Sequence, residues 1–176
     1  MPNSCGIYLD ACCFIDTVKE AVGQTLASDR SNYVWFLKQI TQACRDGELD
    51  VYTSVISIAE CTHADGDLSP KVKSTFESLL MSGQYVKLVQ PTPFIATDAR
   101  DLRWRHGVSL RGADAIHVAS ALDRKCEEFV TTDAQAKKIA AKATLERLGL
   151  RVIRASETKC LPTKYLQLGL PGTISR

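Results

Sequence analysis

Residues 7–14 read Ile7-Tyr8-Leu9-Asp10-Ala11-Cys12-Cys13-Phe14, an apolar run that ends at a carboxylate and continues into a helix-like segment. The same order recurs at residues 129–133, where an apolar run ends at Asp133. Glu60 and Asp114 lie early in two further helical patterns. Open α/β sheets gather their functional groups where strands end and helices begin. We therefore expect Asp10, Glu60, Asp114 and Asp133 to meet at the carboxyl ends of the strands of one sheet.

Strand-like and helix-like segments alternate along the chain. Strands are expected at residues 7–9, 51–53, 85–90, 129–131 and 151–153. Helices are expected from residue 11 to about 22 and over 29–46, 70–81, 93–106, 112–125 and 134–148, and a further helix carries Glu60. The expected N-caps are Asp29, Ser54 or Ser57, and Ser69, and the expected stops are Gly47 and Gly149. This alternation predicts a three-layer α/β/α fold with a mainly parallel central sheet.

The length of 176 residues fits one domain. We expect that domain to span residues 1–155 and to be followed by a C-terminal extension, residues 156–176, of unknown role. The extension contains two prolines and two glycines. The sequence allows it either to pack on the domain or to fray, because termini are ordered only when they are tied down.

Composition indicates a cytoplasmic protein. No apolar run approaches the length of a membrane span, and no secretory signal pattern opens the chain. The seven cysteines are odd in number and several lie in apolar segments, so we expect reduced, packed thiols rather than a disulfide framework. Cys61 and His63 lack further partners at the spacing of a structural zinc site, so we do not expect one.

The four carboxylates can also be explained separately. Asp10 and Asp133 could cap the helices that follow them. Glu60 could lie on a solvated helix face, and Asp114 could be a first-turn acid favoured by the helix dipole. If the four converge, however, their mutual repulsion requires a cation. Ligation by oxygen alone favours a hard ion, Mg²⁺ or Mn²⁺.

Four segments in order resemble the acidic motifs of PIN-domain ribonucleases, most closely those of VapC-type toxins from toxin–antitoxin pairs. They are residues 8–16, 53–60, 112–121 and 130–133, and the resemblance covers roughly residues 6–155. It implies metal-dependent endonucleolytic cleavage of RNA, with Asp10, Glu60, Asp114 and Asp133 as catalytic and metal-binding residues. It also implies a cognate antitoxin. A stand-alone RNA-processing PIN nuclease and a noncatalytic PIN-fold binding module remain alternatives.

Two other folds place an aspartate after the first strand. Phosphatases of the haloacid dehalogenase type need a second aspartate two positions later, where this chain has Cys12. Receiver domains need an acidic pair near the first strand and a lysine at a late strand end, and neither is present. Both classes are therefore disfavoured.

Several neighbours of the four acids could support the site. Ser54, Thr131 and Thr132 could hold a ligand oxygen or a metal-bound water, or they could bond the nearby backbone. His117 follows Asp114 by three residues on the same helical face, and we expect a packed histidine rather than a ligand, because hard ions do not favour imidazole. Asp16 is expected to make a hydrogen bond or a cap.

A net charge of +2 gives no global attraction to nucleic acid, so any RNA-binding surface must be local. The candidate contacts are Arg103, Arg105, Arg111 and Lys137, with Trp104 as a possible stacking surface. The alternative is that Trp104 is core and the arginines form a solvated face.

We also expect a homodimer. The helical segment 31–44 carries Trp35 and Phe36 outside its main apolar stripe, so its apolar arc is wider than one core face requires. The alternative is a helix that is buried on two sides within one domain.

Overall fold

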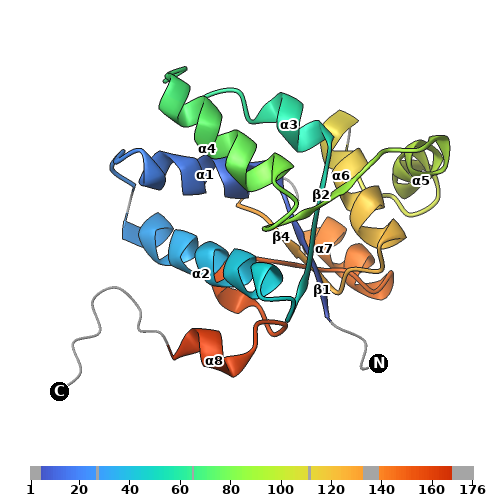
Figure 1. The fold of residues 1–176 in the computed structure, drawn as a ribbon. Helices are drawn as coiled ribbons and strands as arrows, with labels where there is room; N and C mark the ends of the chain where they lie inside the picture. Colours follow the sequence, from blue (N-terminus) through green and yellow to red (C-terminus); the bar gives the residue numbers. More distant parts are fainter. Residues whose placement is uncertain (1–4, 27, 65, 111, 133–138, 168–176) are drawn as a thin grey trace.

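The computed structural model describes residues 5–26, 28–64, 66–110, 112–132 and 139–167 (Figure 1). Its centre is one parallel sheet of five strands in the order β3-β2-β1-β4-β5. The strands are β1 (Gly6–Leu9), β2 (Asp50–Ser54), β3 (Lys87–Val89), β4 (Glu128–Val130) and β5 (Arg151–Ile153). All four pairings are parallel. The predicted three-layer α/β/α fold is confirmed.

The strand order reverses at β1, which pairs with β2 on one side and with β4 on the other. Leu9 of β1 is in register with Val130 of β4, and the backbone N–H of Asp10 donates to the carbonyl of Val130 at 3.1 Å. The carboxyl ends of β1 and β4 therefore lie side by side. In doubly wound folds this reversal point is where functional groups gather.

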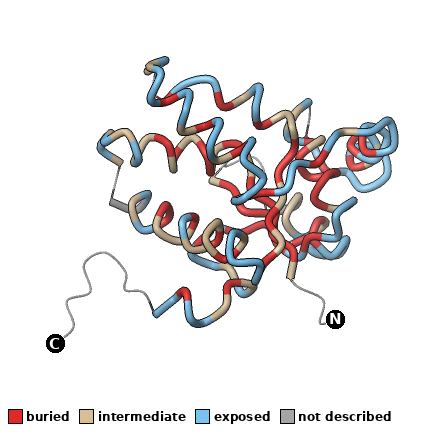
Figure 2. The backbone as a smooth tube through the Cα atoms, viewed as in Figure 1, coloured by how far each residue is buried: buried red, intermediate tan, exposed pale blue. Residues whose placement is uncertain are grey.

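Helices cover both faces of the sheet. Core side chains of α1 (Ala11–Ala21), α2 (Ser28–Arg45) and α4 (Pro70–Met81) pack with Ile7 and Leu9 on one face. Those of α5 (Pro93–Trp104), α6 (Gly112–Asp123) and α7 (Ile139–Arg147) pack with Tyr8 on the other. Neighbouring β1 residues thus face opposite layers, as a strand period of two requires. Figure 2 shows the buried residues concentrated along the strands and on the inward sides of the helices.

Local signals explain most helix boundaries. The hydroxyl of Ser69 accepts from the N–H of Val72 and caps α4, and glycines with φ of +74° and +90° follow α2 and α7 at Gly47 and Gly149. These are the expected cap and stops, since a left-handed residue suits glycine. Asp29 is not the N-cap of α2, because the helix already includes Ser28. Boundaries read from a pattern vary by a residue or two.

The first part of the C-terminal extension packs against the domain. It forms a 3-10 turn η1 (Ala155–Glu157) and a short helix α8 (Thr163–Leu166). Leu161 and Tyr165 are buried in the same core cluster as α2, and the Tyr165 hydroxyl donates to Asp46 at 2.7 Å. Of the two alternatives for the extension, packing on the domain is therefore confirmed as far as residue 167. Residues 168–176 lie outside the described part of the chain.

Glu128 is a buried carboxylate that no motif in the sequence marks. It is only 1% exposed, at the start of β4. Arg151 of β5 donates to it at 3.0 Å, and the backbone N–H of Lys159 donates at 2.9 Å. A buried carboxylate is tolerated when it is paired and hydrogen-bonded in this way. Glu128 therefore ties the C-terminal extension to the amino end of the sheet, whereas Asp10 lies at its carboxyl end.

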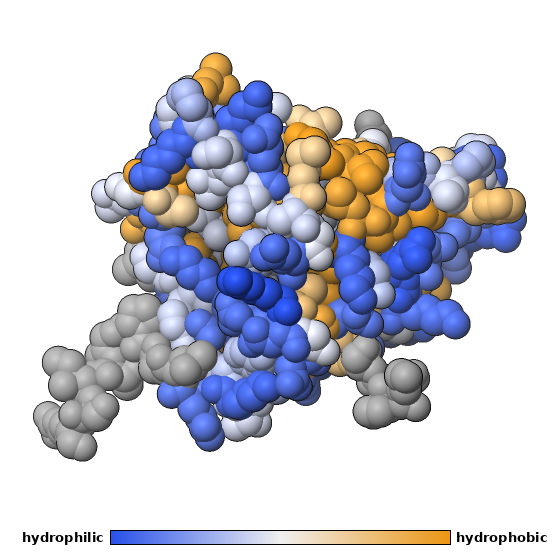
Figure 3. Space-filling view, viewed as in Figure 1, coloured by the Kyte–Doolittle hydropathy of each residue, from blue (hydrophilic) through white to orange (hydrophobic). Residues whose placement is uncertain are grey.

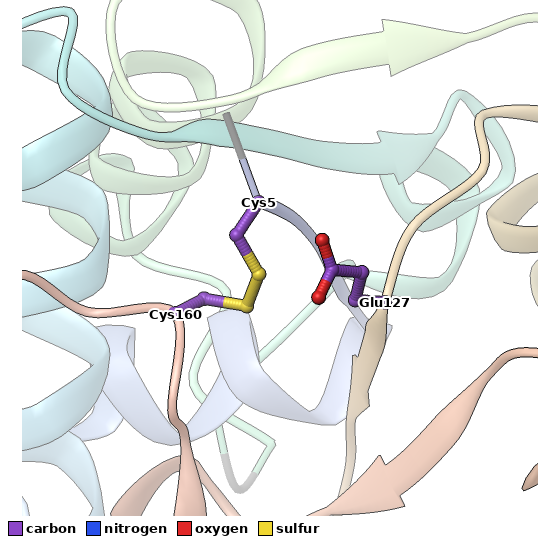
Figure 4. Close-up of side chains that lie close together, drawn as sticks. All are labelled: Cys5, Glu127 and Cys160. Carbon is purple, nitrogen blue, oxygen red and sulfur yellow. A yellow bond between two sulfur atoms is a disulfide. The ribbon is translucent and has the colours of Figure 1, made fainter. Parts of the chain in front are cut away.

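The expectation that all cysteines are reduced is wrong for one pair. Cys5 and Cys160 form a disulfide with a Cα–Cα distance of 5.5 Å, and the Glu127 carboxylate lies beside it (Figure 4). The chain returns to the start of β1 after 155 residues, a proximity that sequence spacing cannot reveal. The free cysteines are Cys12, Cys13, Cys44, Cys61 and Cys126. Among the described residues, no helix has the length and apolar character needed to cross a membrane.

Candidate active site

Asp10 lies immediately after β1 and is the N-cap of α1. Its Oδ1 accepts from the backbone N–H of Ala11 at 2.8 Å, and its Oδ2 accepts from the hydroxyl of Thr131 at 2.6 Å. The alternative that Asp10 caps the following helix is therefore confirmed. The same two bonds fix both carboxylate oxygens at the junction of β1 and β4. Asp10 can therefore cap α1 and at the same time lie at the carboxyl ends of β1 and β4.

Cys12 also belongs to this cluster, although its place in the sequence does not mark it as a site residue. Its half-buried sulfur lies 3.5 Å from Oδ2 of Asp10 and accepts from the N–H of Thr132 at 3.3 Å. The neighbouring thiol of Cys13 donates to the Val130 carbonyl at 3.2 Å, and burial raises the pKa of Cys13 well above its usual value. Cys13 therefore stays protonated and holds α1 against β4.

Glu60 is the last residue of α3 (Ile56–Glu60) and does not simply lie on a solvated face. Its Oε2 lies 2.7 Å from Nε2 of His117, which is only 1% exposed. The other ring nitrogen of His117, Nδ1, lies 2.8 Å from the Tyr8 hydroxyl. Burial raises the pKa of Tyr8 far above its usual range, so the side chain remains a phenol. The expected packed histidine is found, and it bonds a candidate acid.

Asp114 lies in the first turn of α6 and is exposed. It precedes His117 by three residues, which places the two on the same face of the helix. Asp133 lies outside the described residues. Among the described residues, Asp10, Glu60 and Asp114 do not form a group whose carboxyl oxygens all lie within 4.8 Å of one another. The described acids therefore do not pack into a tight cage. They are linked through neighbours: His117, on the helix of Asp114, contacts Glu60, and the Cys61 thiol next to Glu60 lies 3.7 Å from the carbonyl of Ala11, which follows Asp10.

The small hydroxyl residues have different surroundings. Thr131 is fully buried and bonds Asp10. Ser54, also buried, accepts from the N–H of Ile56 at 3.3 Å and thus serves the start of α3, although the N-cap position itself is Val55. Asp16 is buried and accepts from Arg30 at 3.0 Å, as expected of a residue outside the acid cluster.

A comparison with known protein families matches residues 7–142 to the PIN domain. The chain belongs to the PIN domain family. The match spans β1 to the first residues of α7 and so includes the candidate acids. PIN domains are generally nucleases that use divalent metals. No curated protein matches the chain.

The donors of this PIN domain fit a hard divalent ion. The described acids supply oxygen ligands only, which suits Mg²⁺ and Mn²⁺. Mg²⁺ dehydrates reluctantly and is usually held by one or two carboxylates together with several waters. Acids that do not all lie within 4.8 Å of one another are compatible with such a water-rich site. Asp10 or Glu60 could each ligate an ion directly or through water.

The other cluster of metal-ligand types lies away from these acids. Cys5, Glu127 and Cys160 place their ligand atoms within 4.8 Å of one another, and they are the one such group that the described residues contain. The two sulfurs are bonded to each other, so neither is a thiolate (Figure 4). Metal ligation by cysteine requires the thiolate. This cluster is therefore a disulfide beside a carboxylate.

An apolar hollow of about 500 Å³ adjoins the Asp114 end of α6. Figure 3 shows apolar side chains gathered over α6, between α3 and α5. The lining residues are Ile56, Ala96, Ala99, Arg100, Arg103, Trp104, Leu110, Gly112, Ala113, Ala115 and Ile116. Trp104 is 73% exposed, so the alternative that it is core is wrong. The buried stripe of α5 is made by Ile95, Ala99 and Leu102 instead.

The basic residues near this hollow differ in their partners. The guanidinium of Arg100 lies 4.7 Å from the ring centroid of Trp104. Arg105 pairs with Asp101 at 2.9 Å, whereas Arg103 has no carboxylate partner among the described residues. Arg103 is thus the described arginine of this helix that is most available to a phosphate. Arg111 and Lys137 lie outside the described residues.

Proposed function

We propose that this PIN domain is a metal-dependent endoribonuclease that cleaves RNA phosphodiester bonds. The observation that supports this most directly is the fixed carboxylate of Asp10 at the junction of β1 and β4. Both of its oxygens are oriented by hydrogen bonds from Ala11 and Thr131. An acid that only capped a helix would not need the second bond.

The proposed catalytic and metal-binding residues are Asp10, Glu60, Asp114 and Asp133. A bound Mg²⁺ or Mn²⁺ would activate a water and neutralise charge that develops on the phosphoryl and leaving oxygens. Asp10, oriented by Thr131, would hold the ion. Glu60 would hold a second ion or orient the attacking water. Thr132 and Ser54 would hold a ligand oxygen or a metal-bound water next to these acids and would not contact the substrate.

RNA would reach the acids along the hollow beside α6. Trp104 offers an exposed ring on which an unpaired base can stack. Arg103 is exposed and has no carboxylate partner in the described part of the chain, so its guanidinium can contact a phosphate. Arg111 and Lys137 are further proposed contacts. Arg105, a candidate from the sequence, is not proposed as a contact, because its guanidinium is already paired with Asp101 at 2.9 Å.

The biological setting is a narrower proposal. The likeness of the acidic motifs to VapC-type toxins supports a cytoplasmic toxin with a cognate antitoxin. A homodimer through α2 stays a prediction. Trp35 and Phe36 are half-buried and contact each other edge to face at a centroid distance of 4.9 Å. These two side chains are thus less exposed than Phe94 and Trp104 of α5.

The decisive experiment incubates the purified chain with structured RNAs that contain single-stranded loops. We expect cleavage with Mg²⁺ or Mn²⁺ and none after exhaustive chelation. Cleavage that survives chelation would overturn the metal-dependent mechanism. A short upstream reading frame whose product binds the chain and blocks cleavage would support the toxin, and its absence would favour a stand-alone RNA-processing nuclease.

A further inference from the structure

His117 is held at both ring nitrogens inside the protein. Nε2 lies 2.7 Å from Oε2 of Glu60, and Nδ1 lies 2.8 Å from the Tyr8 hydroxyl. The Tyr8 ring meets the imidazole edge to face and stacks on Phe129, with centroid distances of 5.8 Å and 5.3 Å. Packing and hydrogen bonds therefore fix the position and the plane of the His117 ring.

The direction of the bond to Glu60 follows from the groups themselves. An ionised carboxylate can only accept hydrogen bonds, so Nε2 carries a hydrogen toward Glu60 whether the ring is neutral or charged. With Nε2 bonded to a carboxylate and Nδ1 bonded to a hydroxyl, neither nitrogen is left to ligate a metal. His117 can therefore influence an ion only through Glu60.

Among the described residues, His117 is the one side chain that bonds Glu60. Glu60 ends a helix of five residues that has no side-chain N-cap, and its side chain is 33% exposed. A glutamate in that place has several accessible rotamers, and ordering it costs conformational entropy. The bond to His117 occupies Oε2 and leaves Oε1 to an ion or a water.

We propose that His117 is a positioning residue that presents Glu60 to the divalent ion, with Tyr8 as its anchor. This inference rests on the proposed function. It links strand β1, which ends beside Asp10, to helix α6, which carries Asp114, through one chain of hydrogen bonds. Partners that orient a metal ligand in this way contribute roughly 10- to 100-fold in metal affinity or activity.

Two substitutions of similar size test the proposal. The amide nitrogen of His117→Gln can reach the position of Nε2 and donate to Glu60, whereas the shorter His117→Asn can reach only the position of Nδ1. We expect His117→Asn to weaken Mn²⁺ binding roughly 10- to 100-fold and to lower kcat with little change in KM for RNA. We expect His117→Gln to recover most of both. Mn²⁺ binding is measured by titration calorimetry or electron paramagnetic resonance.

Further variants identify the route of the effect. In a Glu60→Ala background, His117→Asn should change neither Mn²⁺ affinity nor kcat, because its partner is gone. Tyr8→Phe should show a smaller loss in the same direction. Equal behaviour of the Gln and Asn variants, or an undiminished effect without Glu60, would overturn the proposal.

The proposed role of His117 and the proposed ribonuclease function can fail independently of each other. A wild-type chain that binds Mn²⁺ but does not cleave RNA would refute the ribonuclease, while the ranking of Mn²⁺ affinities would still test His117. A wild-type chain that binds no Mn²⁺ would overturn this inference directly. If His117→Asn does not fold, the test uses Tyr8→Phe and His117→Gln, each compared with wild type. A full Mn²⁺ affinity in Tyr8→Phe would count against the proposal. A loss of Mn²⁺ affinity in His117→Gln as large as in Glu60→Ala would also count against it.

Discussion

The hydroxyl of Thr131 donates to Oδ2 of Asp10 at 2.6 Å and thereby joins the end of β4 to the end of β1. The two residues are 121 positions apart in the chain. They meet because β1 and β4 are parallel neighbours at the point where the strand order reverses. The bond therefore shows how the topology, rather than any local motif, orients the first acid of the candidate site.

Asp10→Asn should abolish RNA cleavage without weakening the fold. The amide removes the charge that would hold the ion, but asparagine caps helices as well as aspartate does. Its NH₂ group can also donate to the Thr131 hydroxyl. We expect the free energy of unfolding to change by no more than about 0.5 kcal/mol. Cleavage assays and guanidinium unfolding measure the two effects, and an undiminished cleavage rate in the folded variant would contradict the assignment.

Thr131→Val should reduce cleavage by roughly 10- to 100-fold, because a valine of the same shape cannot orient Oδ2 of Asp10. Losing this buried hydrogen bond should also cost about 1 kcal/mol of stability. Thr131→Ser retains the hydroxyl and is the matched control. Kinetics of the two variants side by side give the test: equal rates would show that the hydroxyl plays no part in the reaction.

Much of the fold could be predicted from the sequence because its signals are local. A short apolar run that ends at Asp10 marks a strand followed by a helix, and Ser69 with Pro70 marks the start of α4. The parallel sheet follows from the alternation of such segments. Asp10 could be chosen for the same reason, since it lies where a strand ends. Glu60 is expected early in a helix, but it is the last residue of α3, a helix of only five residues.

The contacts that orient those acids could not be predicted, because they join distant parts of the chain. Thr131 was a candidate only by its position before Asp133, and Tyr8 looked like an ordinary strand residue. The pairing of Cys5 with Cys160 depends on the packing of the extension against the start of β1. Periodicity gives no information on contacts of this range.

The disulfide leads to a prediction about stability. It joins residues 155 positions apart, and a covalent link of that kind restricts the unfolded chain. Cys160→Ser should therefore lower the free energy of unfolding by roughly 2–4 kcal/mol in non-reducing buffer. In reducing buffer, wild type and variant should be nearly equal. Cys44→Ser, which alters a free thiol, is the control, and a difference between wild type and Cys160→Ser that persists in reductant would show that the cross-link is not its source.

Stability should fall at alkaline pH because buried thiols resist ionisation. Burial raises the pKa of Cys61 and of Cys126 from 9.0 to about 12. Between these values the folded state binds more protons than the unfolded state, so the free energy of unfolding decreases as pH rises. The slope approaches about 1.4 kcal/mol per pH unit for each thiol. Cys126→Ala should flatten the decline between pH 9 and 11 in guanidinium unfolding, and an unchanged slope would contradict this cause.

The surface at the end of α5 gives a prediction about substrate binding. Trp104 is 73% exposed beside the apolar hollow, and stacking of one base on such a ring contributes about 1–3 kcal/mol. Trp104→Ala should therefore raise KM for RNA by roughly 5- to 150-fold with little change in kcat. Arg103→Ala should raise KM as well, and its effect should shrink at high salt, since a phosphate contact releases counterions.

Two residues at the ends of α5 serve as matched controls for this surface: Phe94 in its first turn and Arg105, which follows its last residue. Phe94 is 81% exposed at the opposite end of α5, and Arg105 is already paired with Asp101 at 2.9 Å. Phe94→Ala and Arg105→Ala should therefore change KM much less than Trp104→Ala and Arg103→Ala. Steady-state cleavage of a loop-containing RNA at two salt concentrations measures all four variants. If the controls raise KM as much as the Trp104 and Arg103 variants do, the effect belongs to the helix as a whole and not to a stacking surface beside the acids.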